Sequence, residues 1–279
     1  MKLSVGDKRK RFRELHQSGC FVLPNAWDIG SARYLASLGF KAVASTSAGF
    51  AFSRGLPDNA VDRDVVLEHL RELVEATDLP VNADFENGFA HDPRQVAENV
   101  RLGVQTGVAG LSIEDSTGDK SKPLYDLDHA VKRIRAAREA IDKSGCDVIL
   151  VGRAECFLVG KPDIAEVTRR LKAYADAGAD CLYAPDIQTG DEVTAVVKAV
   201  QPKPVNVLIS GPGPLTIAGV AELGVRRVSV GGALARAAWG GFIRAARGLA
   251  GQGTFDGFDD AAPFGELNGL FRSMRQSNE

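Results

Sequence analysis

Four segments of the chain share one pattern: Leu38-Gly39-Phe40-Lys41-Ala42-Val43, Thr106-Gly107-Val108-Ala109-Gly110-Leu111, Ala177-Gly178-Ala179-Asp180-Cys181-Leu182 and Leu223-Gly224-Val225-Arg226-Arg227-Val228. In each, an amphipathic stretch precedes the glycine and a short apolar run follows it. Glycine adopts the left-handed backbone conformation that ends a helix. We therefore expect a helix to end at each glycine and a strand to begin about three residues later.

Strand candidates alternate with helix candidates along the whole chain. The short, apolar strand candidates are 21–24, 42–45, 81–84, 110–114, 148–153, 181–184, 204–208 and 227–230. The amphipathic helix candidates lie near 28–38, 62–76, 93–106, 127–144, 163–177, 190–199, 214–223 and 232–248. Runs that are apolar on both faces are typical of parallel strands covered by helices, so this alternation indicates βαβ units.

Eight βα units favour a closed α/β barrel of the (β/α)8 TIM type over an open sheet. An open sheet that binds a dinucleotide would need a glycine-rich turn after the first strand, and Pro24-Asn25-Ala26-Trp27-Asp28 is not such a turn. Asp28 is instead typical of a helix N-cap. We expect one barrel domain over 1–279, with an N-terminal helix within 1–19 and a C-terminal arm and additional helix over 251–279.

Composition excludes several classes of partner. The 279 residues are 44% hydrophobic and 25% charged, which is typical of a globular protein. Basic residues number 34 against 36 acidic ones, so no basic excess favours nucleic acid. No apolar run is long enough to span a membrane, and no apolar segment near the N-terminus resembles a secretory signal. The cysteines, at 20, 146, 156 and 181, lack metal-ligand spacing, so we expect buried free thiols in a cytoplasmic protein.

Polar side chains gather where barrels place their chemistry, at the carboxyl ends of the predicted strands. The charged ones are Asp84, Glu86, Glu114, Asp115, Arg153 and Glu155, and the neutral ones include Ser45, Thr46, Ser47, Asn82, Asn206 and Ser210. Several carboxylates at one rim repel each other unless a cation lies among them. Mg²⁺ suits such a site, with Mn²⁺ as an alternative, and the arginine could bind a substrate carboxylate. The alternative interpretation is that these acids cap helices or form salt bridges.

The order and spacing of the motifs resemble the isocitrate lyase/phosphoenolpyruvate mutase superfamily, from about Phe21 to Gly232. The motifs are Pro24-Asn25-Ala26-Trp27-Asp28 with Ser31-Ala32-Arg33, Ser45-Thr46-Ser47 with Gly55-Leu56-Pro57-Asp58, Asn82-Ala83-Asp84 with Gly88-Phe89, Gly110-Leu111-Ser112-Ile113-Glu114-Asp115, and Gly152-Arg153-Ala154-Glu155. The resemblance implies a (β/α)8 barrel, Mg²⁺ dependence and small 2-oxo or 2-hydroxy carboxylate substrates. It also implies a homotetramer, a dimer of dimers whose terminal helices are often exchanged between subunits.

The resemblance also implies roles for individual residues. Ser45 and Thr46 bind the substrate carboxylate or the developing enolate oxygen, and Asp58 positions substrate or metal. Arg153 binds the substrate carboxylate. The catalytic candidates are thus Asp58, Glu114 and Arg153, and the substrate-binding candidates are Ser45, Thr46, Ser47, Arg153, Asn206 and Ser210.

The metal-ligand candidates are Asp84 and Glu114, which hold Mg²⁺ directly or through water in this resemblance. The chain departs from the superfamily at strand three, where a D-x-D pattern is replaced by Asn82-Ala83-Asp84. Asn82 can ligate through its carbonyl oxygen, but one negative charge is lost. We expect Glu86 to restore the missing carboxylate.

A second departure concerns the loop after strand four, residues 116–125. The superfamily's lyases carry Lys-Lys-Cys-Gly-His there, with the cysteine as proton donor. This loop has no cysteine and no histidine, which leaves the proton donor open. Lys120, Lys122 and Tyr125 are candidates for an acid or an anion clamp, or are solvated loop residues.

We therefore expect a Mg²⁺-dependent lyase that cleaves a C–C bond in a small 2-hydroxy- or 2-oxo-carboxylate through an enolate. Two alternatives stay open. One is P–C bond chemistry, as in a phosphonopyruvate mutase or hydrolase. The other is a non-catalytic barrel that binds a 2-oxo acid, which the absent loop cysteine and Asn82 favour.

Overall fold

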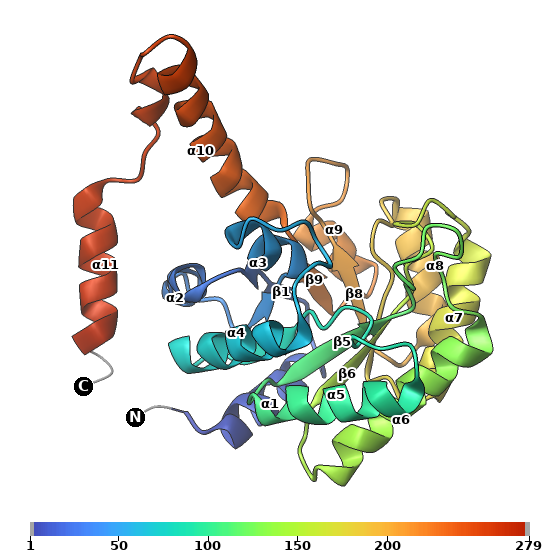
Figure 1. Ribbon diagram of the computed structural model, residues 1–279. Helices are drawn as coiled ribbons and strands as arrows, with labels where there is room; N and C mark the ends of the chain where they lie inside the picture. The colour runs from blue at the N-terminus through green and yellow to red at the C-terminus, as the bar shows by residue number, and fades with distance from the viewer. Residues whose placement is uncertain (1–2, 277–279) are drawn as a thin grey trace.

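The computed structural model describes residues 3–276, which form a parallel β-barrel surrounded by helices (Figure 1). The strands are β1 (Phe21–Leu23), β2 (Asn25–Ala26), β3 (Val43–Ser45), β4 (Val81–Ala83), β5 (Gly110–Glu114), β6 (Ile149–Arg153), β7 (Cys181–Tyr183), β8 (Val205–Leu208) and β9 (Arg227–Ser229). They pair in the order β1-β9-β8-β7-β6-β5-β4-β3-β2, and every pair is parallel. The predicted TIM-type fold is confirmed.

Pro24 divides the first predicted strand into β1 and β2. Proline has no N–H for a ladder hydrogen bond, so regular pairing stops at this residue. β1 then pairs with β9, whereas β2 pairs with β3. Since β1 and β2 are consecutive parts of one extended segment, the two pairings join the edges of the sheet and close the barrel.

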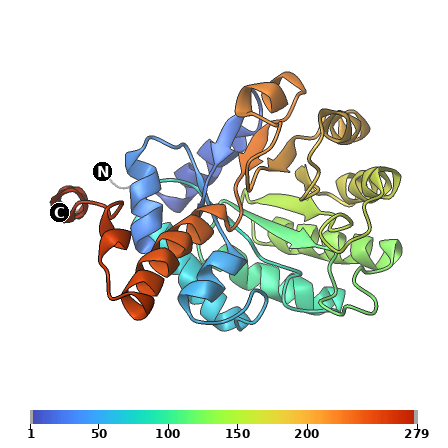
Figure 2. The same cartoon turned by 90° about the horizontal axis from the view of Figure 1, so that it is seen from above.

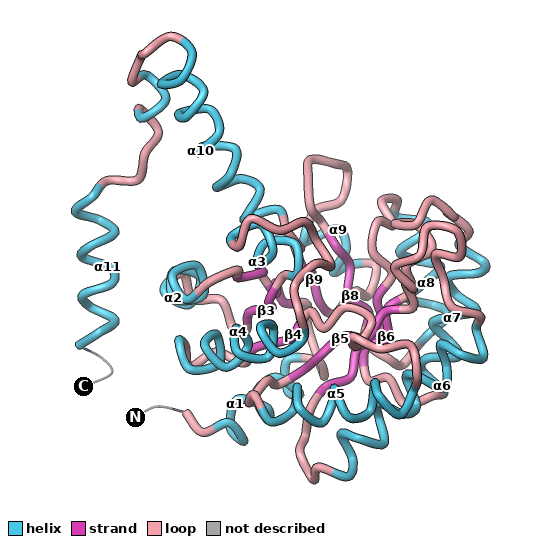
Figure 3. Tube along the Cα trace, viewed as in Figure 1, coloured by secondary structure: helices cyan, strands magenta, loops and turns pink. Residues whose placement is uncertain are grey.

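Helices surround this ring of strands (Figure 2, Figure 3). They are α2 (Ile29–Ser37), α4 (Arg63–Ala76), α5 (Pro93–Gln105), α6 (Leu127–Lys143), α7 (Ile164–Asp176), α8 (Gly190–Val200) and α9 (Ile217–Glu222). The predicted glycines Gly39, Gly107, Gly178 and Gly224 have φ angles of +83°, +91°, +104° and +89°. The predicted left-handed helix ends are therefore confirmed. Asp28 caps α2 through a capping box, also as predicted.

The N-terminal helix α1 (Val5–Leu15) packs at the amino ends of the strands. Its Phe12 is fully buried in the interior cluster, where it contacts Phe21 edge to face. The Arg9 guanidinium donates to the carbonyls of Val104 and Val108, which ties the helix to the barrel. This packing fills the amino half of the interior and leaves the carboxyl half for a site.

Two regions differ from the sequence expectation. A short helix, α3 (Ser47–Ser53), begins directly after β3, with Thr46 as its N-cap. The predicted helix near 232–248 is α10 (Ala233–Gly251), which extends to the start of the expected C-terminal arm, and a 3₁₀ turn, η1 (Asp256–Phe258), follows it. α11 (Phe264–Gln276) forms as expected, and α10 and α11 project away from the barrel (Figure 1).

The cysteines are free, as predicted. Cys156 and Cys181 are buried as expected, but the expectation is wrong for Cys20 and Cys146, which are partly exposed. Within residues 3–276, the structure contains no helix with the length and apolar character that crossing a membrane requires.

Candidate active site

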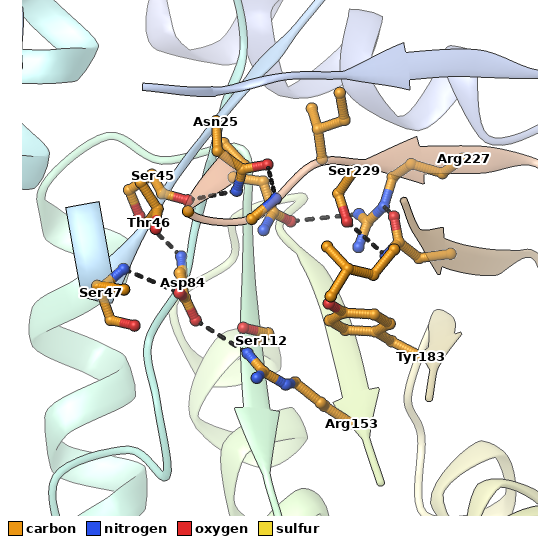
Figure 4. A pocket seen from close by; sticks show the side chains of 18 of the residues that line it. Asn25, Ser45, Thr46, Ser47, Asp84, Ser112, Arg153, Tyr183, Arg227 and Ser229 are labelled. Carbon is orange, nitrogen blue, oxygen red and sulfur yellow. Dashed lines mark hydrogen bonds and ion pairs between the residues drawn. The ribbon is translucent and has the colours of Figure 1, made fainter. Parts of the chain in front are cut away.

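A cavity of about 140 Å³ opens at the carboxyl end of the barrel (Figure 4). This volume suits a small acid rather than a nucleotide. The predicted site residues in its wall are Ser45, Thr46, Ser47, Asp58, Asn82, Asp84, Arg153 and Asn206. Sequence reasoning missed other polar members of the wall, which are Asn25, Ser112, Tyr183, Arg227 and Ser229.

Arg153, the last residue of β6, is the centre of a group of ion pairs. Its Nη1 lies 3.2 Å from Asp84 Oδ1 and 3.3 Å from Glu114 Oε2, and its Nε donates to Glu155 Oε1. The guanidinium carbon lies 5.1 Å from the centre of the Tyr183 ring. One buried cation thus faces carboxyl groups from three strand ends, so the acids outnumber the cation.

Burial disfavours the charged form of these carboxyl groups. It raises the pKa of Glu114 and of Glu155, although Arg153 acts in the opposite direction. Burial alone would lower the pKa of Arg153, but Glu155 and Glu114 raise it well above its ordinary value. The guanidinium therefore remains charged and is the cation on which these acids depend.

Glu86 adds a further carboxyl group close to these acids. Its φ angle is +49°, in a region that residues other than glycine rarely adopt and that is enriched at functional sites. Its carboxyl group makes no hydrogen bond to the described residues. Burial raises the pKa of Glu86 to about 8, and the charges of Asp84 and Asp58 add to this effect. A cation near Glu86 would favour the ionised form of its carboxyl group and lower its pKa.

The end of β3 fixes Asp84 in place. The backbone N–H of Asp84 donates to Ser45 Oγ over 2.8 Å, and the Ser47 N–H donates to Asp84 Oδ2 over 2.9 Å. Thr46 Oγ1 accepts the N–H of Gly49 at the start of α3. Both hydroxyl oxygens thus accept a backbone bond, which leaves their own protons for a ligand.

Asp58 reaches the cavity from the loop after α3. Its carboxyl group hydrogen-bonds to the Ser47 side chain, and burial is the main cause that raises the pKa of Asp58. Ser210 does not line this cavity. It belongs instead to a neighbouring cavity of about 130 Å³ in the loops after β7 and β8.

The predicted loop acids lie away from the cavity. Lys122 Nζ pairs with Asp126 at the surface over 2.7 Å. The Tyr125 hydroxyl bonds to His91 Nδ1, and the Arg133 guanidinium lies 4.1 Å from the centre of the Tyr125 ring. The cavity wall includes no residue of the loop 116–125.

The donor set fits a hard divalent cation in its chemistry. Asp84, Glu86 and Glu114 offer carboxyl oxygens, the ligand type that Mg²⁺ prefers, and a bound cation would favour their ionised form. Among residues 3–276, no three acid, histidine or cysteine side chains form a ready-made metal cluster. Asp84 and Glu114 contact Arg153 instead.

Comparisons with known proteins extend over the whole barrel. The profile of the phosphoenolpyruvate phosphomutase family matches residues 12–250. An uncharacterised protein of Mycobacterium tuberculosis is 35% identical over 79% of this chain and 81% of that protein. Oxaloacetate decarboxylase 1 of Pseudomonas fluorescens is 30% identical over 81% of this chain and 78% of that protein. The structure of a candidate lyase/mutase from Burkholderia cenocepacia is 48% identical, with a TM-score of 0.93 over 96% of this chain and 97% of that chain.

The ion pairs of Arg153 predict a large effect on stability. In Arg153→Met, buried carboxylates lose their cation, so we expect the free energy of unfolding to fall by about 3–5 kcal/mol in urea denaturation. The control is Arg94→Met, because Arg94 is 93% exposed and pairs with Asp92 at the surface. We expect no measurable loss there. Equal effects of the two substitutions would contradict this interpretation.

Proposed function

The chain belongs to the phosphoenolpyruvate phosphomutase family, and we propose that it is a Mg²⁺-dependent C–C lyase of small 2-oxo or 2-hydroxy carboxylates. Proteins of this family are lyases and mutases. The observation that supports the proposal most is the group of buried carboxylates on Arg153 beside a small polar cavity. The name of the Pseudomonas relative, oxaloacetate decarboxylase, is consistent with such a substrate.

Arg153 and the β3 hydroxyl groups would bind the substrate. Arg153 Nη2 makes no hydrogen bond to the described residues, although Nε and Nη1 are engaged by acids. This nitrogen can donate to a substrate carboxylate. Ser45 and Thr46 can donate their hydroxyl protons to the oxygen on which negative charge develops.

Asp84, Glu86 and Glu114 would hold Mg²⁺, directly or through water. The ion would supply positive charge that stabilises an enolate oxygen. In this proposal, Glu86 provides the carboxylate that Asn82 lacks. The positive charge of the ion would also offset the surplus negative charge around Arg153.

In the proposed reaction, the bond between carbon 3 of the 2-oxo acid and the leaving carbon breaks. The leaving carbon departs as CO₂ when it is a carboxylate, or as a carbonyl group when it carries a hydroxyl, whose proton passes to solvent. The electron pair stays on the pyruvate-like fragment as an enolate, and carbon 3 then takes a proton. Tyr183 is our candidate donor, because it lines the cavity and burial raises the pKa of Tyr183 to about 12. The phenol therefore carries its proton at neutral pH. Arg153 would stabilise the phenolate until solvent returns the proton.

Product analysis tests the proposed function. We expect release of pyruvate or glyoxylate from a member of a panel of 2-hydroxy acids and oxaloacetate, with loss of activity in EDTA. Conversion of phosphonopyruvate alone would instead assign P–C chemistry. Binding of a 2-oxo acid without turnover would assign the non-catalytic barrel.

Substitution of Tyr183 tests the proton donor. Tyr183→Phe removes the proton and retains the ring, so we expect kcat to fall by about 10²–10⁴-fold with KM little changed. The control is Tyr125→Phe, since Tyr125 lies outside the cavity. A Tyr183→Phe enzyme with wild-type kcat would rule out this role.

We also propose that the C-terminal arm packs on a second copy of the chain. Large apolar side chains are exposed along α10, η1 and α11, including Phe242 at 61%, Phe255 at 68% and Phe264 at 86%. Exposed apolar surface of this kind marks interaction sites. Light scattering should show a dimer or tetramer that dissociates when residues 251–279 are removed. A monomeric full-length chain would contradict the proposal.

A further inference from the structure

The floor of the cavity contains a buried cation that the proposed reaction does not use. Arg227 is the first residue of β9, at the opposite end of the strand from the catalytic rim, and is 2% exposed. Its side chain lies on the same face of β9 as that of Ser229, two residues later, and both line the cavity. In Figure 4, Arg227 enters from the upper right and Arg153 from below.

The bonding partners of Arg227 are neutral. Its Nε donates to Asn206 Oδ1 over 2.8 Å, and its Nη1 lies 3.4 Å from both Asn82 Oδ1 and His16 Nε2. Burial, and after it the positive charge of Arg227, lower the pKa of His16 to about 3. This histidine is therefore uncharged at neutral pH. Among the described residues, no carboxylate forms an ion pair with Arg227.

A buried guanidinium without a negative partner is unfavourable. Arg153, by contrast, contacts three carboxylates. The Nη2 group of Arg227 makes no hydrogen bond to the described residues, so this donor can meet a ligand in the cavity. The amides of Asn82 and Asn206 are engaged by Arg227, which explains why two predicted site residues lie deep in the wall.

We infer that Arg227 forms an anion-binding subsite at the floor of the cavity, so that the ligand is a small dicarboxylate. One carboxylate would lie at the rim with Arg153, and the second would lie against Arg227. This inference rests on the proposed function in taking the cavity as a carboxylate site. It goes further by assigning the second carboxylate to Arg227, a residue of the cavity floor that the proposed function does not use.

Two inert acids of equal length test the subsite. Succinate and butyrate both have four carbons, and succinate has the second carboxylate. In calorimetric titrations with Mg²⁺ present, we expect the wild-type protein to bind succinate at least about tenfold more tightly than butyrate, since a charged hydrogen bond contributes about 1.5–3 kcal/mol. In Arg227→Gln, this ratio should fall to near one.

Arg226→Gln is the matched control, because the Arg226 guanidinium donates to the Gly19 carbonyl and does not line the cavity. It should keep the wild-type ratio. If Arg227→Gln does not fold, Asn206→Asp decides, since it places a carboxylate on Arg227 at nearly constant volume, leaves the proposed metal ligands intact and should also lower the ratio. A wild-type ratio near one would overturn the inference. So would a ratio that is unchanged in the folded Arg227→Gln or, failing that, in Asn206→Asp. The ratio is independent of turnover, so loss of the proposed lyase activity would not remove it.

Discussion

Arg153 is buried among Asp84, Glu114 and Glu155, and the geometry of the rim at the carboxyl end of the barrel depends on this group of charges. The contacts join the ends of β4, β5 and β6 through one guanidinium. Buried carboxylates without a cation are strongly unfavourable, so the position of Arg153 constrains all three side chains. Because the acids outnumber it, the same group would be stabilised by the second cation that we propose.

A second set of buried polar contacts, centred on Asp115, holds the end of β5 in place. Asp115 Oδ2 accepts bonds from Arg170 over 3.0 Å and from the Tyr174 hydroxyl over 2.5 Å, and its Oδ1 accepts the Glu155 N–H. The Arg170 guanidinium also donates to the Tyr125 carbonyl, at the end of the loop 116–125. The end of β5 is thereby fixed to α7 while the middle of this loop remains exposed. This arrangement is suited to a loop that varies above a rigid site.

The barrel could be predicted from the sequence because its signals are local: glycines end helices and apolar runs form strands. The rule that barrels place functional residues at the carboxyl ends of their strands predicts that Asp84 and Arg153 lie together. The structure confirms this contact. The same rule does not select Arg227, because a residue at the start of a strand lies at the other end of the barrel. In the sequence, Tyr183 lies within an apolar strand and does not stand out as a site residue. Ser45-Thr46-Ser47 resembles a loop, so the pattern does not indicate α3. Ion-pair partners and cavity depth depend on packing between distant segments, which periodicity does not encode.

Mg²⁺ binding to the substrate-free protein tests the central claim most directly. Calorimetric titration should show that the wild-type chain binds Mg²⁺. Glu86→Gln keeps the shape of the side chain but cannot ionise when the metal binds, so it should bind at least ~10-fold more weakly. Wild-type protein that binds no Mg²⁺ would contradict the claim that the surplus carboxylates of the rim form a metal site. Unchanged affinity in Glu86→Gln would show that Glu86 does not replace the carboxylate missing at Asn82.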